Sequence, residues 1–289
     1  MNDSLPQGLL EIFRQRFGSD LRVDLESVSG GCVNITQRIK VGGEGFFLKL
    51  GSKEAHVMYS GEAEGLLELS KADAFRIPKV VDRGKDDEHA WLLLEWLDLG
   101  TPLEMEEAGR LLAQQHRVVS DNHGFRSDNH IGATPQKNGQ DQDWVTFFGL
   151  HRLKALSDLG YSKGLKFSQL NLLLEKMPTF FGNRTVEPSL LHGDLWSGNV
   201  SGLNGGGVAV YDPAVHYGDR ECDLAMTELF GGFSSFFYDA YNEAYPVDDG
   251  YELRKGLYQL YHIMNHALLF GGSYVSQSGR LIDRLLKLN

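Results

Sequence analysis

Short apolar runs, separated by polar residues and glycines, dominate the first hundred positions, a pattern typical of β-strands. Strands are predicted at residues 21–28, 35–41, 46–50, 77–81 and 90–97. Two stretches differ, because residues 9–17 and 53–70 repeat their hydrophobic positions at helical spacing. The glycine-rich residues 42–45 join two of the strands and predict a hairpin turn.

Beyond residue 100 the hydrophobic pattern is mostly helical. Gly100 and Pro102 interrupt the chain at this point. We therefore predict an α+β fold of two lobes, a small β-rich N-lobe at residues 1–99 and a larger, mainly helical C-lobe at residues 100–289. Helices are predicted at residues 101–119, 144–159, 166–180, 221–243, 251–270 and 280–288. The first is expected to open with a capping box at Thr101-Pro102-Leu103-Glu104.

Two segments of the predicted C-lobe lack helical spacing. Residues 121–143 are rich in Gly, Asn, Asp and Gln, and they predict a long loop. A loop of this length in a compact domain is commonly functional or disordered. Residues 190–211 are expected to form short strands and loops, with a turn at residues 204–207.

Composition and charge narrow the classes of function. The 289 residues are 42% hydrophobic, enough for one or two ordinary cores. The formal net charge of -11 argues against a nucleic-acid or anionic-membrane surface. No stretch has the length and apolarity of a signal peptide core or a transmembrane helix. The only cysteines, Cys32 and Cys222, do not make a disulfide framework, which favours a reducing, cytoplasmic location.

The most informative motif is His-Gly-Asp-Leu-Trp-Ser-Gly-Asn at residues 192–199. Asp194 can accept a proton from a hydroxyl group, and five residues later Asn199 can turn its amide oxygen toward the same cavity. A short apolar strand then leads to Asp212, and the amide and carboxylate oxygens are hard ligands suited to Mg²⁺. The alternative is a surface loop with ordinary turn-forming residues, and the strand before Asp212 favours the catalytic site.

Two other residues of the motif have alternative explanations. His192 is better explained as a structural histidine that supports the loop than as a base, because Asp194 already fills that role. Trp196 either packs in the interior or forms a wall of the acceptor pocket, and its position two residues from the base favours the pocket.

A base beside two magnesium ligands is the set that a phosphotransferase needs to move a phosphoryl group onto a hydroxyl. Such a kinase also needs a cation on the triphosphate, and Lys49 fits this requirement. It alternates with apolar residues in a predicted strand, so it faces either solvent or the cleft. The presence of the other catalytic residues favours phosphate contact. Glu62 and Glu64 lie on the following helix and face different directions, so only one can pair with Lys49; Glu62 is the preferred partner.

Nucleotide contacts are expected at two further places. Gly30 and Gly31 precede Lys49 between two strands, where their N–H groups can approach phosphates, although a plain hairpin turn is the alternative. The apolar segment that contains Glu95 and Leu97 leads to the lobe boundary. Its backbone is placed to hydrogen-bond adenine.

The order of these motifs resembles the aminoglycoside phosphotransferase-like branch of the protein-kinase fold, and within it the fructosamine kinase (ketosamine 3-kinase) family. The likeness spans nearly the whole chain, and the most specific segments are 192–199 and 212–233. Further matching segments are residues 30–32, 62–66, 128–132, 135–139, Trp144 and residues 147–148.

The resemblance implies an ATP- and Mg²⁺-dependent kinase that phosphorylates the 3-hydroxyl of a ketosamine, free or protein-bound, giving an unstable product that releases the amine. This is a deglycation activity. By the same resemblance Asp194 is the base, Asn199 and Asp212 are the metal ligands, and Lys49 and Glu62 position the phosphates. The resemblance also implies that Asp223 braces the catalytic loop.

The acceptor pocket is less well defined by the resemblance. Asn129, Trp196 and His216 are its candidate residues, and His216 stands where the family more often has tyrosine. An aminoglycoside or choline-type kinase of the same fold is an alternative, and so is a pseudokinase that binds nucleotide without turnover. The complete catalytic set argues against the pseudokinase.

Cys32 lies in the predicted phosphate loop and is a redox candidate. A thiol near backbone donors favours the thiolate. Its oxidation, including an intermolecular disulfide, would then disturb ATP binding. The alternative for Cys32 is an inert small residue that fills the turn. The protein would then be a monomer, whereas an intermolecular disulfide would give a redox-linked dimer.

Overall fold

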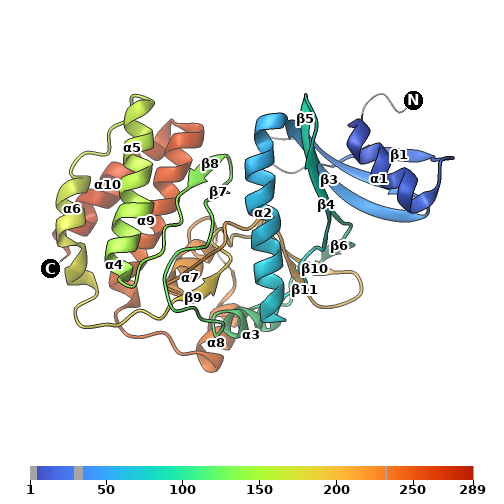
Figure 1. Ribbon diagram of the computed structural model, residues 1–289. Helices are drawn as coiled ribbons and strands as arrows, with labels where there is room; N and C mark the ends of the chain where they lie inside the picture. The colour runs from blue at the N-terminus through green and yellow to red at the C-terminus, as the bar shows by residue number, and fades with distance from the viewer. Residues whose placement is uncertain (1–4, 29–34, 232, 289) are drawn as a thin grey trace.

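A five-stranded antiparallel sheet forms the smaller lobe (Figure 1). The computed structural model describes residues 5–28, 35–231 and 233–288. The strands are β1 (Val23–Ser27), β2 (Ile35–Val41), β3 (Glu44–Ser52), β4 (Val80–Lys85) and β5 (His89–Glu95), in the order β1-β2-β3-β5-β4. Helix α1 (Gln7–Phe17) packs its apolar side, Leu9, Leu10 and Phe13, in one cluster with Ile39, Phe46 and Leu48 of the sheet. Burial of these side chains holds the helix on the sheet.

Helix α2 (His56–Leu69) stands between the sheet and the larger lobe (Figure 1). Short 3₁₀ turns, Lys53–Ala55 and Ser70–Ala72, flank it. Tyr59, Ala63 and Leu66 of this helix belong to a buried cluster that also contains Leu190 and Val215 of the larger lobe. The helix therefore shares a hydrophobic core with the lobe that carries the catalytic motif.

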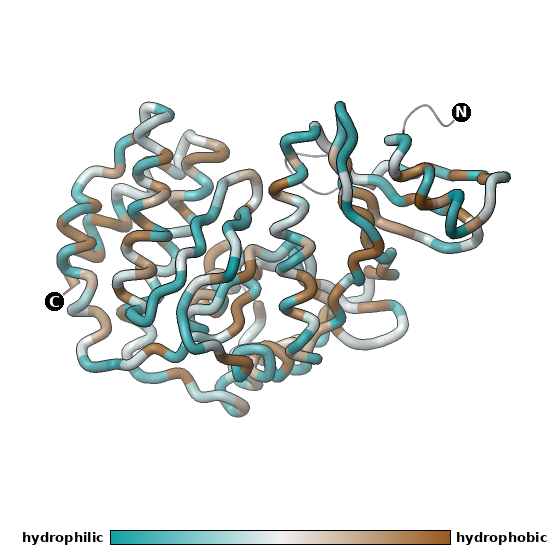
Figure 2. Tube along the Cα trace, in the orientation of Figure 1, coloured by the Kyte–Doolittle hydropathy of each residue, from teal (hydrophilic) through white to brown (hydrophobic). Residues whose placement is uncertain are grey.

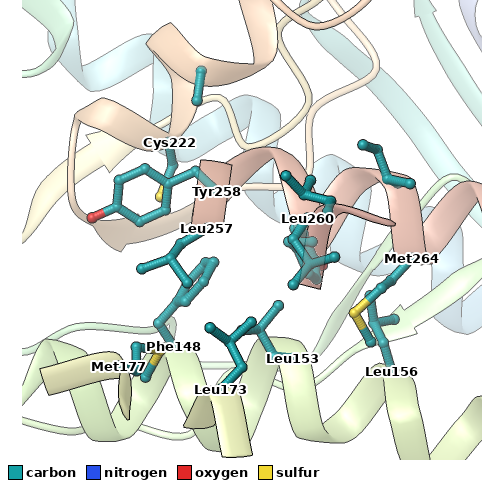
Figure 3. Packing of buried hydrophobic residues seen from close by; sticks show 14 of the residues in the cluster. Phe148, Leu153, Leu156, Leu173, Met177, Cys222, Leu257, Tyr258, Leu260 and Met264 are labelled. Carbon is teal, nitrogen blue, oxygen red and sulfur yellow. The ribbon is translucent and has the colours of Figure 1, made fainter. Parts of the chain in front are cut away.

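Helices make up most of the larger lobe. They are α3 (Met105–Gln115), α4 (Trp144–Phe147), a π-helix (Phe148–Lys154), α5 (Ala155–Ser162), α6 (Leu170–Lys176), a 3₁₀ helix (Met177–Phe180), α7 (Glu221–Thr227), α8 (Ser235–Ala244), α9 (Tyr251–Phe270) and α10 (Ser273–Lys287). Hydrophobic and hydrophilic residues alternate along these helices (Figure 2). The apolar residues of α9 meet those of the π-helix and α6 in the core (Figure 3).

Short strands connect the helices and place the catalytic motif. β9 (Ser189–Leu191) pairs with β12 (His216–Gly218), and β7 (Asn129–Ile131) pairs with β8 (Thr134–Gln136). β10 (Val200–Leu203) lies between β11 (Val208–Val210) and β6 (Leu99–Thr101). None of the helices in the described part of the chain has the length and apolarity to cross a membrane.

The two-lobed α+β architecture is confirmed, with corrections in detail. The predicted capping box at residues 101–104 is wrong, because Thr101 ends β6 and α3 begins only at Met105. The long predicted loop contains the β7–β8 hairpin. The expected helix over residues 221–243 is two helices, and the last helix begins at Ser273. The boundary after residue 99 stays a prediction, and β6 straddles it.

Candidate active site

The loop that carries the catalytic motif lies against the segment that follows Asp212. Pairing of β9 with β12 sets them side by side, and the Ala214 N–H donates to the His192 carbonyl at 2.9 Å. Gly193 has a φ of +82°, and a Cβ atom there would lie 2.1 Å from the Ala214 oxygen. Only glycine fits this crossing, which explains the glycine of the motif.

Lys49 joins the two lobes through two carboxylates. Its Nζ atom lies 2.7 Å from Oε1 of Glu62 on α2 and 2.8 Å from Oδ1 of Asp212. Burial favours the neutral amine, but the charges of Asp212 and Glu62 outweigh it and raise the pKa of Lys49 above its usual value. The side chain therefore stays an ammonium ion. Glu64 instead accepts a hydrogen bond from Ser127 Oγ at 2.7 Å.

Asp194 and Asn199 lie on one loop, and their side chains approach each other, with the Asn199 amide nitrogen 3.5 Å from Asp194 Oδ2. The Asn199 amide nitrogen donates to the Asp194 carbonyl oxygen at 2.9 Å, which fixes the orientation of the amide. Burial raises the pKa of the half-buried Asp194 carboxyl to about 7, and the charges of Asp212 and Asp223 act in the same direction. A carboxylate with this pKa is matched to proton transfer near neutral pH.

The oxygen atoms available at this site fit Mg²⁺. Within the described residues, the Asn199 Oδ1 atom accepts no hydrogen bond, and the Oδ2 atom of Asp212 is not the one that contacts Lys49. Amide and carboxylate oxygens are the ligand types that Mg²⁺ prefers. The described residues contain no group of three or more His, Cys, Asp or Glu side chains that could hold a metal ion. A magnesium ion here would therefore depend on phosphate oxygens and water.

Asp223 supports the catalytic loop from behind. Its carboxylate accepts the N–H groups of His192 at 2.8 Å and Gly193 at 2.9 Å, and it lies 3.2 Å from Nε2 of His116. Burial alone would raise its pKa, but these partners hold the pKa of Asp223 below its usual value. His192 Nε2 lies 3.0 Å from the Tyr211 carbonyl, a contact that ties the loop to the strand before Asp212.

Two of the three predicted acceptor residues are buried. Trp196 is 39% exposed, whereas Asn129 and His216 are each 3% exposed. The Asn129 carboxamide donates to the Val215 carbonyl at 2.8 Å, and the His216 Nδ1 atom lies 3.1 Å from the Ala214 carbonyl. The structure thus places both side chains as supports of the segment after Asp212, and an acceptor contact by either of them stays a prediction.

The predicted nucleotide-binding residues are placed only in part. Gly30, Gly31 and Cys32 lie outside the described residues. The Glu95 side chain binds the Arg76 guanidinium. Among the described residues, the Leu97 N–H has no hydrogen-bond partner, which leaves it available to a ligand.

Several residues that shape the site were not singled out from the sequence. Gln136, Asn138, Arg152 and Tyr261 are buried polar residues behind the catalytic segment. Gln136 and Asn138 fall in the matching segment 135–139, but the four residues follow no helical or strand period, so no pattern marked them as site residues. Gly61 and Gly65 on α2 are the exception, because two glycines four residues apart signal a close approach on one helix face.

Comparison with known proteins finds relatives along nearly the whole chain. The family model described as fructosamine kinase matches residues 8–288. A probable ketoamine kinase of Synechocystis sp. is 38% identical over 286 residues, which cover 98% of this chain and 97% of the relative. The chloroplastic protein-ribulosamine 3-kinase of Arabidopsis thaliana is 36% identical, over 91% of this chain and 82% of that protein.

Solved structures extend the likeness to the fold. A Haemophilus somnus protein whose crystal structure carries the name fructosamine-3-kinase has a TM-score of 0.88 and 30% identity, with 96% of each chain covered. An apo aminoglycoside phosphotransferase APH(4)-Ia has a TM-score of 0.61 and 18% identity, over 96% of this chain and 98% of that one. The second likeness concerns the protein-kinase-like fold alone.

Proposed function

The chain belongs to the fructosamine kinase family, and we propose that it transfers the γ-phosphoryl group of ATP to a sugar hydroxyl of a ketosamine. The observation that carries this proposal is the position of Lys49. Its ammonium group is held between Glu62 and Asp212. Asn199 and the base candidate Asp194 lie on the neighbouring loop, where the Asn199 amide nitrogen also approaches the Asp212 carbonyl.

Each of these residues has a defined task in the proposed reaction. The Lys49 ammonium neutralises phosphate oxygens, and the two carboxylates keep it charged and in place. Asp194 accepts the proton of the attacking hydroxyl, for which its raised pKa is suited. Asn199 and Asp212 would hold Mg²⁺, which when bound supplies positive charge to the phosphates. Asp223 keeps the loop of Asp194 in one conformation.

The acceptor is inferred from the relatives, whose names are those of ketoamine and ribulosamine kinases. Exposed Trp196, two residues from the base, offers an apolar surface for the sugar. We place the transfer at the 3-hydroxyl. The 3-phosphate is unstable and releases the free amine, so the reaction removes sugars from amines in a deglycation role. A cytoplasmic location suits the use of ATP and the lack of a disulfide framework.

The test is an acceptor panel with ATP and Mg²⁺. A ketosamine with a fructose or ribulose moiety is compared with an aminoglycoside, with choline and with no acceptor, and ADP release and phosphorylated acceptor are both measured. We expect ADP release only with ketosamines, and a phosphorylated sugar that decays to free amine. Phosphorylation of the aminoglycoside or choline instead would replace the proposed substrate, and nucleotide binding without turnover on any acceptor would favour a pseudokinase.

A further inference from the structure

Helix α2 approaches the segment after Asp212 unusually closely, and two glycines permit the approach. A Cβ atom on Gly61 would lie 2.9 Å from Asn129 Cβ and 3.0 Å from Asn129 Cα. A Cβ atom on Gly65 would lie 3.0 Å from Cγ2 and 3.3 Å from Cβ of Val215. Separations of this size are shorter than ordinary van der Waals contacts. The glycine face of α2 therefore rests directly on Asn129 and Val215.

These two supports are bonded to each other and to their neighbours. The Asn129 amide nitrogen donates to the Val215 carbonyl at 2.8 Å. The Gln136 amide nitrogen donates to Asn129 Oδ1 at 2.8 Å and to the Ala214 carbonyl at 3.0 Å. Asn138 donates to the same Asn129 oxygen at 2.7 Å. The β7–β8 hairpin thus holds the backbone of residues 214–215 through two carboxamides, and the nearby Asn138 carboxamide holds Asn129 in place.

The hairpin is anchored in turn to the core of the larger lobe. Gln136 Oε1 accepts the Tyr261 hydroxyl of α9 at 2.6 Å, and Asn138 Oδ1 accepts the Arg152 guanidinium of the π-helix at 2.7 Å. Asn129, Gln136, Asn138 and Arg152 are all at least 97% buried. A buried network of this kind has few alternative arrangements, because each lost bond leaves a polar group without a partner.

The consequence lies at the catalytic lysine. Glu62 follows Gly61 directly, and only Pro213 separates Asp212 from residues 214–215, whose backbone the hairpin holds. Both carboxylates must reach the one Lys49 Nζ atom, at 2.7 and 2.8 Å. The distance between them depends on how closely α2 lies on the larger lobe, and this closeness depends on Gly65 over Val215 and on Gly61 over Asn129.

We propose that Gly65, Asn129 and Gln136 are positioning residues of the phosphoryl-transfer site. They fix the separation of the Glu62 and Asp212 carboxylates, and so they place the Lys49 ammonium and Asp212 for the Mg²⁺–nucleotide complex. The inference rests on the proposed function, and it gives Asn129 a role toward the nucleotide rather than toward the acceptor.

Gly65→Ala tests the proposal with one added methyl group. The methyl pushes α2 away from Val215, so the affinity for Mg²⁺ with a non-hydrolysable ATP analogue is expected to fall. A misplacement of an ångström or less costs up to about 100-fold, and we expect a loss of at least about 10-fold in kcat/KM for ATP. The KM of the acceptor should not change. Calorimetry of the nucleotide complex supplies the first value without any acceptor.

Val215→Ala provides a rescue that a purely structural role would not show. It removes the Cγ2 atom that the new methyl would meet, so the Gly65→Ala/Val215→Ala double variant should recover most of the nucleotide affinity. Its thermal stability should nevertheless stay below that of the wild type, because the buried core loses two methyl groups of Val215 and regains only one. Gly279→Ala in α10 is the matched control, since nothing lies within 4 Å of its new Cβ atom; its kinetics should not change.

Gln136→Met keeps the volume and removes both donors, and it gives the same test if Gly65→Ala does not fold. A weaker nucleotide complex with an unchanged acceptor KM supports the proposal. Normal nucleotide affinity in both variants overturns it, and so does a loss confined to acceptor KM or a double variant weaker than Gly65→Ala. A wild-type protein that binds Mg²⁺–nucleotide but phosphorylates no ketosamine would refute the proposed substrate and leave this test intact.

Discussion

Asp194 lies where burial and two neighbouring carboxylates all oppose its negative charge. The pKa of about 7 follows from this environment, in which Asp212 and Asp223 contribute repulsion and only Asn199 donates a compensating hydrogen bond. An aspartate held in this way is costly to the fold unless its charge has a use. The environment of the residue therefore supports a role in proton transfer independently of the motif.

Asp194→Asn should reduce turnover by about 10²- to 10⁴-fold, the usual contribution of a general base. Asparagine keeps the size of the side chain but cannot accept the proton. Nucleotide affinity should persist, because one source of repulsion near the phosphates is gone. Steady-state rates and calorimetry measure the two effects. Asp158→Asn, at an exposed aspartate of α5, is the control, and wild-type turnover in Asp194→Asn would contradict the assignment.

Asp212→Ala should weaken Mg²⁺-dependent nucleotide binding by about tenfold or more, equivalent to about 1.4 kcal/mol or more of lost charge-assisted contact. Lys49 would keep only Glu62 as a partner, and one oxygen ligand would be lost. The measurement is a Mg²⁺ titration at a fixed concentration of ATP analogue. The same half-saturating Mg²⁺ in variant and wild type would show that Asp212 is not a ligand.

At this scale the sequence predicted side chains whose chemistry is specific. A strand lysine, a helix glutamate and a motif of fixed spacing restrict the possible partners, and the structure does bring Lys49, Glu62 and Asp212 together. The sequence could not predict that Asn129 would be buried. An asparagine in a polar loop has the same pattern whether it binds a ligand or braces a backbone, and only tertiary packing separates the two.

A side chain on helix α7 holds the backbone of the catalytic loop. The first turn of α7 carries Asp223, whose carboxylate takes the N–H groups of His192 and Gly193. Residues 192–193 lie outside any helix or strand, so these two N–H groups have no partner within an element of their own. The helix therefore replaces the hydrogen bonds that a regular element would supply.

Asp223→Ala should lower both stability and turnover. Two buried N–H groups would lose their acceptor, at about 1–3 kcal/mol each. Urea denaturation measures the loss, and kcat should fall with it because the loop that carries Asp194 is no longer fixed. Thr227→Val on the same helix removes a hydroxyl that bonds only to its own helix and to Tyr238. It should leave kcat unchanged, and an equal fall in both variants would contradict the bracing role.

Elements with a clear period were predicted well, and irregular ones were not. Strands β2, β3 and β5 and helix α9 match the prediction, because their apolar residues are buried in the hydrophobic clusters on either side of the sheet and in the helical lobe. The start of α3 was misplaced because pairing of Thr101 with Gly202 on β10 outweighs the local capping preference. The π-helix was not predicted, since its side chains keep an apolar pattern close to that of an α-helix.

Three hydrophobic clusters organise the part of the chain that the structure describes. One lies between α1 and the sheet, one fills the helical lobe, and the third joins α2 and β5 to the catalytic loop region. This third cluster packs both β5 of the sheet and α2 against the larger lobe, so it holds the sheet that carries Lys49 and the helix that carries Glu62 in contact with that lobe. The ion pair between them therefore reports on how the lobes meet.

Buried histidines make the folded molecule sensitive to acid. His123, His216 and His262 are each at most 3% exposed. Burial lowers the pKa of His123 to about 4 and that of His262 to about 3, and it lowers the pKa of His216 well below its usual value. In the unfolded chain each is expected to titrate near its ordinary pKa of about 6.5. Below that pH the unfolded state binds more protons than the folded state.

The free energy of unfolding should therefore fall as the pH drops below about 6.5, by about 1.4 kcal/mol per pH unit for each of these histidines. Above about pH 7.5 both states are neutral at these positions, and the contribution vanishes. Urea denaturation at pH 7.5, 6.0 and 5.0 measures the slope. His262→Gln removes one titrating group, so its slope should be smaller by about one proton. An unchanged slope in His262→Gln would mean that this histidine is protonated equally in both states.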